Sequence, residues 1–253
     1  MNPWNLTPDE WSMVLLKKTP ERAAEDVISG NLPAWDEYLL HYTKDSKEVL
    51  DLGCGAGLDS ANLARRGIKT TLLDLSKKNL DFCANLFRLL KLNGEFRLAD
   101  MTQPLPFEDG SFDTVFSIGV FEYFTDEQIQ SILREAFRVS RKRVIIMVPN
   151  ALSLPYRLGY WYLKETKQWI WGGERPFRTL KPYFKSEANS TFFEFTIAAR
   201  TSLSFLTMPY NGLIKRIVLY VLRLEDDSRV SLFRQGYLLI SIGEKNELTS
   251  KAK

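Results

Sequence analysis

The chain has 253 residues, 45% of them hydrophobic, which is enough for one α/β domain with a substantial core. Its 34 basic and 31 acidic residues give a net charge of +3, too small to indicate a nucleic-acid-binding protein by itself. With two cysteines, no recognisable signal peptide and no uncharged run of roughly 18 residues, we expect a cytoplasmic protein without a membrane span.

Residues 1–45 are expected to form an N-terminal helical layer. The segments Thr7-Pro8-Asp9-Glu10 and Thr19-Pro20-Glu21 each place a cap residue, a proline and acids in the order of a helix start. Pro33 begins a third helical piece, in which Trp35 and Leu39 share a face. We interpret this layer as a lid over the glycine-rich turn that follows.

Residues 46–150 alternate between strand and helix patterns. Helix 125–140 has the clearest signal, because Thr125-x-x-Gln128 is a capping-box pattern that precedes an apolar stripe with a 3.6-residue period. Alternating strands and helices predict a doubly wound, mostly parallel, Rossmann-like α/β sheet. The predicted strands are 47–52, 68–74, 95–99, 113–118 and 143–148, and the predicted helices are 58–66, 77–91 and 125–140.

A glycine-rich turn follows the first predicted strand. Gly53, Gly55 and Gly57 permit positive φ and leave no Cβ between the backbone and a ligand. Their spacing differs from the Gly-x-Gly-x-x-Gly of NAD-binding turns. On its own, a glycine triplet is equally compatible with a purely structural turn.

Acidic residues end the second and third predicted strands. Asp74 lies 21 residues after Gly53, where a carboxylate can accept hydrogen bonds from both hydroxyls of a ribose. Asp100 and Met101 follow the third strand and offer a carboxylate and an apolar side chain to an adenine ring. Open α/β sheets bind their ligands at the carboxyl ends of strands, so these positions predict a nucleoside site.

Together these motifs resemble the class I S-adenosylmethionine-dependent methyltransferases, and in particular the small-molecule group that includes ubiquinone-biosynthesis methyltransferases. The resemblance covers residues 45–150. It implies a seven-stranded sheet with one antiparallel strand, to which predicted strands at 191–199 and 236–243 contribute. The matching segments are 49–57, Leu73-Asp74-Leu75-Ser76, Asp100-Met101, 105–115 and Val120-Phe121-Glu122-Tyr123.

The resemblance also implies S-adenosyl-L-methionine as the cofactor and a set of residues that bind it. A cap at a strand end is the alternative for Asp74 or Asp100 taken singly. No metal site is expected. The implied contacts are Asp51, Gly53, Cys54, Gly55 and Gly57 at the methionine part, Asp74 at the ribose, Leu75, Asp100 and Met101 at the adenine, and Ser117 and Ile118 toward the methionine end.

The sequence assigns no catalytic residue, but it offers three candidates. Positioning supplies much of the rate of an in-line methyl transfer, and a general base is needed only if the acceptor keeps its proton. Glu122 and Tyr123 follow the fourth strand, although many relatives have histidine in place of Tyr123. Glu122 equally fits a salt-bridged acid at a helix start. His41, the single histidine of the sequence, equally fits a packed or surface residue.

The acceptor is expected to bind the aromatic and basic insert at 151–190. Within 151–185, nine of 35 residues are aromatic, and seven basic residues stand against Glu165 and Glu174. With the N-terminal layer, this insert predicts a face for a small-molecule, lipid or lipid-linked glycan acceptor and leaves a peripheral membrane contact through 151–185 open. A lid core with solvated lysines is the alternative. Residues 191–253 complete the domain with two strands and a helix near 212–224.

Three other functions were weighed. A catalytically silent methyltransferase fold could bind S-adenosylmethionine for a regulatory or interaction role. An NAD-dependent oxidoreductase is disfavoured by the glycine spacing and by the lack of a Tyr-x-x-x-Lys pair after the fourth strand. Nucleic acid is not expected as a partner. Ser117-Ile118-Gly119-Val120 stands where base methyltransferases usually carry Asn- or Asp-Pro-Pro-Tyr, and the basic run 138–143 is interpreted as complementing a helix dipole.

Overall fold

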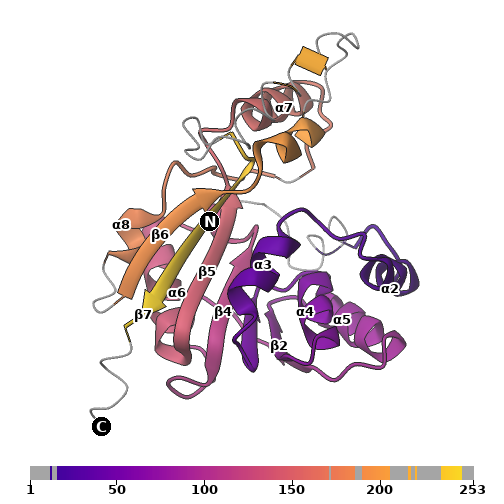
Figure 1. The fold of residues 1–253 in the computed structure, drawn as a ribbon, viewed down its shortest axis with the longest axis vertical. Helices are drawn as coiled ribbons and strands as arrows, with labels where there is room; N and C mark the ends of the chain where they lie inside the picture. The colour runs from indigo at the N-terminus through magenta and orange to yellow at the C-terminus, as the bar shows by residue number, and fades with distance from the viewer. Residues whose placement is uncertain are drawn as a thin grey trace.

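The computed structural model describes residues 12, 16–170, 172–185, 190–205, 216–217, 220 and 235–246. A seven-stranded sheet in the order β3-β2-β1-β4-β5-β7-β6 forms its centre (Figure 1). β7 runs antiparallel to both β5 and β6, and the other neighbouring pairs are parallel, so the predicted Rossmann-like sheet with one antiparallel strand is confirmed. The strands are β1 (Glu48–Leu52), β2 (Lys69–Asp74), β3 (Glu95–Leu98), β4 (Phe112–Ile118), β5 (Ser140–Pro149), β6 (Ser190–Thr196) and β7 (Leu238–Lys245).

Helices cover both faces of this sheet. Within 46–150 each predicted helix and strand is present, with ends that differ from the prediction by at most three residues. Figure 1 shows α3 in front of the sheet and α7 beyond the carboxyl end of β5. The α-helices are α2 (Pro20–Ser29), α3 (Asp36–Thr43), α4 (Leu58–Arg65), α5 (Lys77–Leu89), α6 (Asp126–Val139), α7 (Leu154–Glu165) and α8 (Lys181–Phe184), and the 3-10 helices are η1 (Phe121–Tyr123) and η2 (Ala199–Phe205).

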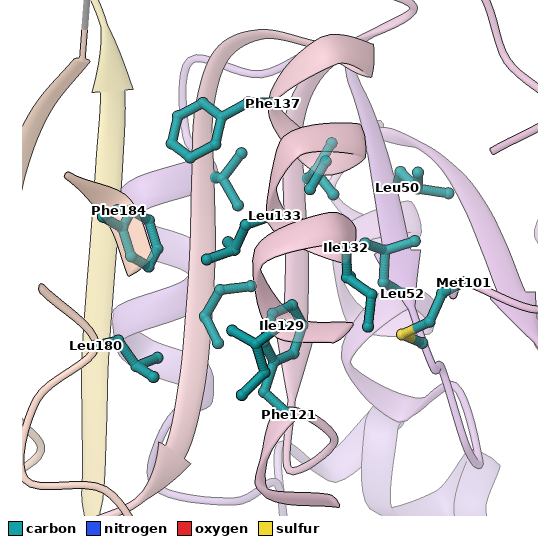
Figure 2. Close-up of a cluster of buried hydrophobic side chains, with 14 of the residues drawn as sticks. Leu50, Leu52, Met101, Phe121, Ile129, Ile132, Leu133, Phe137, Leu180 and Phe184 are labelled. Carbon is teal, nitrogen blue, oxygen red and sulfur yellow. The ribbon is translucent and has the colours of Figure 1, made fainter. Parts of the chain in front are cut away.

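The sheet buries alternate residues of each central strand against opposite helical layers. Leu50 and Leu52 of β1 face the layer that contains α6, whereas Val49 packs with Leu39 of α3 on the other face. Figure 2 shows the α6 side chains Ile129, Ile132, Leu133 and Phe137 pointing toward the sheet. Each such buried side chain contributes about 1.5–3 kcal/mol relative to exposure to water, so the α6 stripe predicted from sequence is a main source of cohesion.

The N-terminal layer agrees with the prediction at α2 and departs from it at α3. Thr19 caps α2, because its hydroxyl accepts a hydrogen bond from the Arg22 N–H. α3 begins at Asp36 rather than at Pro33, since the Pro33 carbonyl first closes a turn with the Asp36 N–H at 3.0 Å. The predicted helix start at residues 7–10 lies outside the described residues, as does most of the predicted helix near 212–224.

The basic run at 138–143 does not complement a helix dipole as a whole. α6 ends at Val139, so only Arg138 lies in its last turn, and Arg141, Lys142 and Arg143 belong to β5. These three side chains form ion pairs with acids of neighbouring segments instead. The pairs include Arg141 with Glu48 and Asp113, Lys142 with Asp45, and Arg143 with Asp45 and Glu244.

The insert begins at an anchored corner after β5. Asn150 is fully buried, and its amide Nδ2 and backbone N–H donate to the carbonyls of Gly236 and Tyr237, each at 2.8 Å. The Ala151 N–H donates to the Phe177 carbonyl at 2.8 Å. Residues 151–177 therefore leave and return at the carboxyl end of the sheet. Among the helices that the structure describes, none is long and apolar enough to cross a bilayer.

Candidate active site

The glycine turn is shaped by both its conformation and its packing. Gly53, Gly55 and Gly57 have φ values of 77°, 53° and 68°, in the left-handed region that side chains with a Cβ disfavour. A Cβ on Gly53 would lie 2.8 Å from Val120 Cγ2, and one on Gly57 would lie 2.7 Å from Cys83 Sγ. The turn is therefore pressed between the loop after β4 and helix α5.

Asp74 holds the glycine turn as well as ending β2. Its buried carboxylate accepts hydrogen bonds from the N–H groups of Gly55 at 3.0 Å and Ser76 at 2.8 Å, and from Asn79 Nδ2 at 3.2 Å. Burial raises the pKa of Asp74, and these hydrogen bonds oppose that shift. The Cys54 thiol, 4.0 Å from Oδ2, is a fourth and weaker donor, so these contacts use the roughly four acceptor sites of the carboxylate. The link to Gly55 and the role of Asn79 were not predicted from sequence.

Asp51 ties β1 to α4. It is 5% exposed, and the Ser60 hydroxyl donates to its Oδ2 at 2.7 Å. Burial raises the pKa of Asp51 well above its ordinary value. Cys54 lies in the turn beside Cys83, and both thiols are free with their sulfurs 3.9 Å apart.

The carboxyl ends of β2 and β3 present carboxylates beside exposed apolar side chains. Asp100 Oδ1 accepts from the Thr102 N–H and hydroxyl at 2.9 and 2.7 Å. Leu75 is 54% exposed and Leu98 is 59% exposed. Leu98 pairs in register with Asp74. An apolar surface next to a carboxylate suits a purine ring, and Leu98 was missed from sequence. Its alternation pattern gave no signal, because all residues of β3 except the half-buried Phe96 are exposed.

The two residues at the end of β4 differ in role. Ser117 is fully buried, and its hydroxyl donates to the Leu52 carbonyl at 2.6 Å, so it joins the ends of β4 and β1 rather than presenting its hydroxyl to a ligand. Ile118 is half-buried and leads into Gly119, whose φ is 69°. Met101 packs on the Cα side of Gly53, as does Val120.

The catalytic candidates Glu122 and His41 lie at opposite ends of the sheet. Glu122 forms no salt bridge with a described residue. It lies in η1, it is 3% exposed, and its Oε2 has no hydrogen-bond partner among the described residues. His41 is exposed in the last turn of α3. Close to it along the chain, the Tyr42 carbonyl and the Asp45 carboxylate accept hydrogen bonds from Arg143 near the start of β5. His41 therefore lies at the amino end of the sheet, opposite the glycine turn.

The insert brings further side chains to η1. The Tyr123 hydroxyl donates to Glu174 Oε2 at 3.3 Å, and the Tyr156 hydroxyl donates to Glu174 Oε1. Burial raises the pKa of Glu174 to about 7, against the effect of the two tyrosine hydrogen bonds. Burial also raises the pKa of Glu122 well above its ordinary value, and the neighbouring Glu174 adds to that shift.

The N-terminal layer reaches the same end of the sheet. The hydroxyls of Ser12 and Ser76 are 2.6 Å apart in a buried contact. Ser76 follows Asp74 by two residues, so this contact lies close to the end of β2. Trp35 Nε1 donates to Asp59 Oδ1 at 3.0 Å, next to the start of α4. Burial raises the pKa of Asp59 to about 7, and the nearby Asp36 adds to this effect.

The sheet order and the glycine turn between β1 and α4 define a Rossmann-like α/β protein, a fold that binds its ligands at the carboxyl ends of its strands. Residues 49–143 match a family model described as a methyltransferase domain. Over these residues the chain is similar to a class I methyltransferase domain, the class whose cofactor is S-adenosylmethionine.

Curated relatives match over this domain. A magnesium-protoporphyrin O-methyltransferase of Rhodobacter capsulatus is 28% identical over 116 residues, which are 46% of this chain and 50% of that protein. A ubiquinone biosynthesis O-methyltransferase of Caulobacter vibrioides is 37% identical over 78 residues, or 31% of each protein. The chain spans half or less of the length of these curated relatives.

Solved structures share the fold at low sequence identity. A magnesium protoporphyrin IX methyltransferase of Synechocystis with bound SAH has a TM-score of 0.51 and 17% identity, covering 89% of this chain and 80% of its own. A geranyl diphosphate C-methyltransferase of Streptomyces coelicolor has a TM-score of 0.57 and 14% identity, covering 84% and 78%.

Proposed function

We propose that this chain transfers the methyl group of S-adenosylmethionine to a small-molecule or lipid-type acceptor. The observation that carries this proposal is the convergence of the glycine turn, Asp74 and the Asp100–Met101 pair at the carboxyl ends of three adjacent strands. The names of the curated relatives support small molecules as acceptors. The cofactor supplies an activated methyl group on a positively charged sulfur.

The residues of the chain fit this cofactor in three places. The glycines let the backbone approach the methionine part, where a side chain would intrude. Asp74 can exchange the weak contact from the Cys54 thiol, at 4.0 Å, for a hydrogen bond from a ribose hydroxyl. Asp100 and the exposed Leu75 offer an acceptor and an apolar face to adenine. Holding the acceptor in line with the donor is then the main task of the protein.

Isothermal calorimetry with S-adenosylmethionine and S-adenosylhomocysteine tests the cofactor site. We expect Asp74→Ala to lower the affinity by about 1.5–3 kcal/mol, as for the loss of hydrogen bonds to a charged group. Asp81→Ala is the control, because Asp81 is an exposed acid of the adjacent α5 that pairs only with Lys77 in the described structure. Thermal unfolding of both variants separates lost affinity from a loosened turn. Wild-type protein that binds neither compound would refute the proposal.

The catalytically silent alternative and an NAD-dependent enzyme predict different results. A silent module would bind S-adenosylmethionine but release no S-adenosylhomocysteine with any acceptor. An NAD-dependent enzyme would consume NADH. The glycine spacing and the Asp74–Gly55 bond support the methyltransferase.

We also propose that the acceptor is presented at a lipid surface through α7. Leu154, Leu158 and Trp161 are exposed at positions i, i+4 and i+7 of this helix, so they share one face. Arg157 and Lys164 are exposed beside them. Apolar side chains flanked by cations suit an anionic lipid interface. Co-sedimentation with phosphatidylglycerol vesicles tests this, and the absence of binding at low salt would remove the proposal.

A further inference from the structure

A buried carboxyl group with one unpartnered oxygen lies next to the glycine turn. Glu122 is 3% exposed, and its Oε2 has no hydrogen-bond partner among the described residues. A Cβ on Gly119 would lie 3.6 Å from Glu122 Oε1, so the carboxyl group lies over the backbone that leaves β4. Val120, in the same loop, packs on Gly53. A buried polar atom without a partner costs free energy, and such atoms in native proteins indicate a ligand, a water or a catalytic role.

A second, half-buried carboxyl group comes from the insert. Glu174 accepts hydrogen bonds from the hydroxyls of Tyr123 and Tyr156, one on each carboxyl oxygen. The next residue, Arg175, donates its N–H to the Glu122 carbonyl at 3.1 Å, so the insert is fastened directly to η1. The guanidinium of Arg175 turns to Asp126 and the Phe124 carbonyl. Neither acid therefore forms an ion pair with a described residue, although Arg175 lies close to both.

We infer that η1 and the insert together form the acceptor site, in which Glu122 accepts the proton of an acceptor hydroxyl group and Glu174 is the positioning residue that supports it. This inference rests on the proposed methyltransferase function and deepens it to O-methylation. The acceptor is a hydroxyl-bearing molecule whose O–H donates to the unpartnered Oε2 of Glu122. The ring of Tyr160 contacts those of Tyr156 and Trp169. Together these three rings supply an apolar wall on the side of the insert.

The proposed step balances. The acceptor oxygen forms a bond to the methyl carbon, the bond from that carbon to the sulfonium sulfur breaks, and its electron pair stays on sulfur as a neutral thioether. The hydroxyl proton passes to the Glu122 carboxylate, which releases it to water after the product leaves. No oxidant, metal ion or further co-reactant is required.

The chemistry of the proposed acceptor site favours a hydroxyl over an amine. A neutral amine attacks through its lone pair and needs no base in the transition state, whereas a hydroxyl is a weak nucleophile until its proton is taken. A carboxyl group whose pKa is raised by burial and by a second acid is a stronger base than an ordinary glutamate. A buried carboxyl oxygen without a partner destabilises the fold. We therefore attribute it to the binding of an acceptor that needs a base.

Matched pairs of acceptors test the assignment. Release of S-adenosylhomocysteine is measured with para-hexylphenol against para-hexylaniline, and with octyl glucoside against octyl glucosylamine, and mass spectrometry identifies the methylated atom. We expect turnover of a hydroxyl member and a loss of about 10²–10⁴-fold in Glu122→Gln. The control Glu127→Gln, an exposed acid of α6, is expected to keep wild-type turnover. If no hydroxyl compound is methylated faster than its amine partner, the inference is wrong.

The pH dependence separates a base from a structural residue. We expect the wild-type rate to rise with pH as Glu122 loses its proton, Glu122→Gln to lose this rise, and Glu122→Asp to restore it at a lower rate. Glu174→Gln removes the neighbouring negative charge, so the midpoint moves to lower pH, whereas the exposed control Glu165→Gln leaves it unchanged.

Calorimetry with S-adenosylhomocysteine accompanies each variant. Intact cofactor affinity with unchanged turnover in Glu122→Gln overturns the acceptor-site inference alone. Failure of the wild-type protein to bind the cofactor overturns the methyltransferase proposal itself.

Discussion

At the scale of single residues, Gly57 shows how conformation and packing act on the same atom. Its φ of 68° costs a residue with a Cβ about 1–2 kcal/mol, and the added Cβ would meet Cys83 Sγ at 2.7 Å and Leu72 Cδ2 at 2.9 Å. Overpacking adds about 1–3 kcal/mol, so we expect Gly57→Ala to lower both the unfolding midpoint and the affinity for S-adenosylhomocysteine.

Gly67→Ala isolates the packing contribution in that comparison. Gly67 has a φ of 84°, but nothing lies within 4 Å of its Cβ position, so this variant carries only the backbone strain. Thermal unfolding of the two variants gives the difference. Equal losses in both would show that the turn relaxes and that the contact with α5 is unimportant.

The burial of Glu122 predicts a conflict between the stability of the fold and the activity of the proposed acceptor site. Its ordinary pKa is near 4.5 and is raised in the folded protein, so between these two values the folded state holds a proton that the unfolded state has released. Stability then falls as pH rises through this window, by about 1.4 kcal/mol for each unit of the shift. Glutamine carries no such penalty. We expect Glu122→Gln to be more stable than wild type at about pH 8, with the difference vanishing near pH 4.

Urea unfolding at these two pH values measures this effect. The exposed Glu127→Gln serves as the control, because an acid in solvent carries no burial penalty. A Glu122→Gln protein that is less stable than wild type at the higher pH would contradict the burial of an unpartnered carboxylate.

The sequence placed the glycine turn and the strand-end acids correctly in the fold because their signals are local. Glycine spacing, and acids at strand ends, follow from the chain within a few positions of each strand. The partners of Glu174 could not be predicted in this way, because Tyr123 and Tyr156 lie 51 and 18 residues away from it along the chain. Nor could the sequence predict that the Ser117 hydroxyl donates to the Leu52 carbonyl of the neighbouring strand, 65 residues away.

At the scale of elements, α3 is fastened to α4 by a buried polar pair. Asp36 is 6% exposed, and Asn62 Nδ2 donates to both of its carboxyl oxygens, at 3.0 and 2.9 Å. Burial raises the pKa of Asp36, and the Asn62 hydrogen bonds oppose the shift. We expect Asn62→Leu to destabilise the protein by about 1–3 kcal/mol, because it leaves a buried carboxylate unpaired.

The pH dependence of that variant identifies the cause. Without Asn62, the pKa of Asp36 rises further, so the loss of stability shrinks as the pH falls and Asp36 takes up a proton. Asn85→Leu, on the exposed face of α5, is the control. A loss independent of pH would show that the larger side chain, rather than the unpaired charge, is responsible.

Elements with one apolar face were predicted well, and those fixed by distant partners were not. α6 combines a complete capping box with a buried stripe, so its sequence alone defines it. The start of α3 and the pairing of the basic run depend on a turn and on acids 93 to 98 residues away, such as Glu48 and Asp45. Periodicity in a single segment carries no information on such partners.

At the scale of the whole molecule, the proposed cofactor site and the proposed acceptor site are built from different parts of the chain. The proposed cofactor site uses β1, β2 and β3. The insert joins the sheet at Asn150, which bonds to the segment just before β7 and bridges Phe177. Figure 1 places α7 beyond the carboxyl end of the sheet, which is also the end where the glycine turn lies. A surface that touched the exposed face of α7 would therefore meet the molecule at the end that carries the proposed active site.

This geometry predicts separable effects on lipid binding and cofactor binding. Leu158 and Trp161 are 38% and 58% exposed, so replacing both with serine removes apolar surface without opening the core. We expect the double variant Leu158→Ser/Trp161→Ser to lose co-sedimentation with phosphatidylglycerol vesicles and to keep wild-type affinity for S-adenosylhomocysteine. Binding by the wild type weakens as salt screens Arg157 and Lys164. Ile28→Ser, which removes a 63% exposed side chain from α2, is the control, and equal loss of sedimentation in it would show nonspecific adsorption.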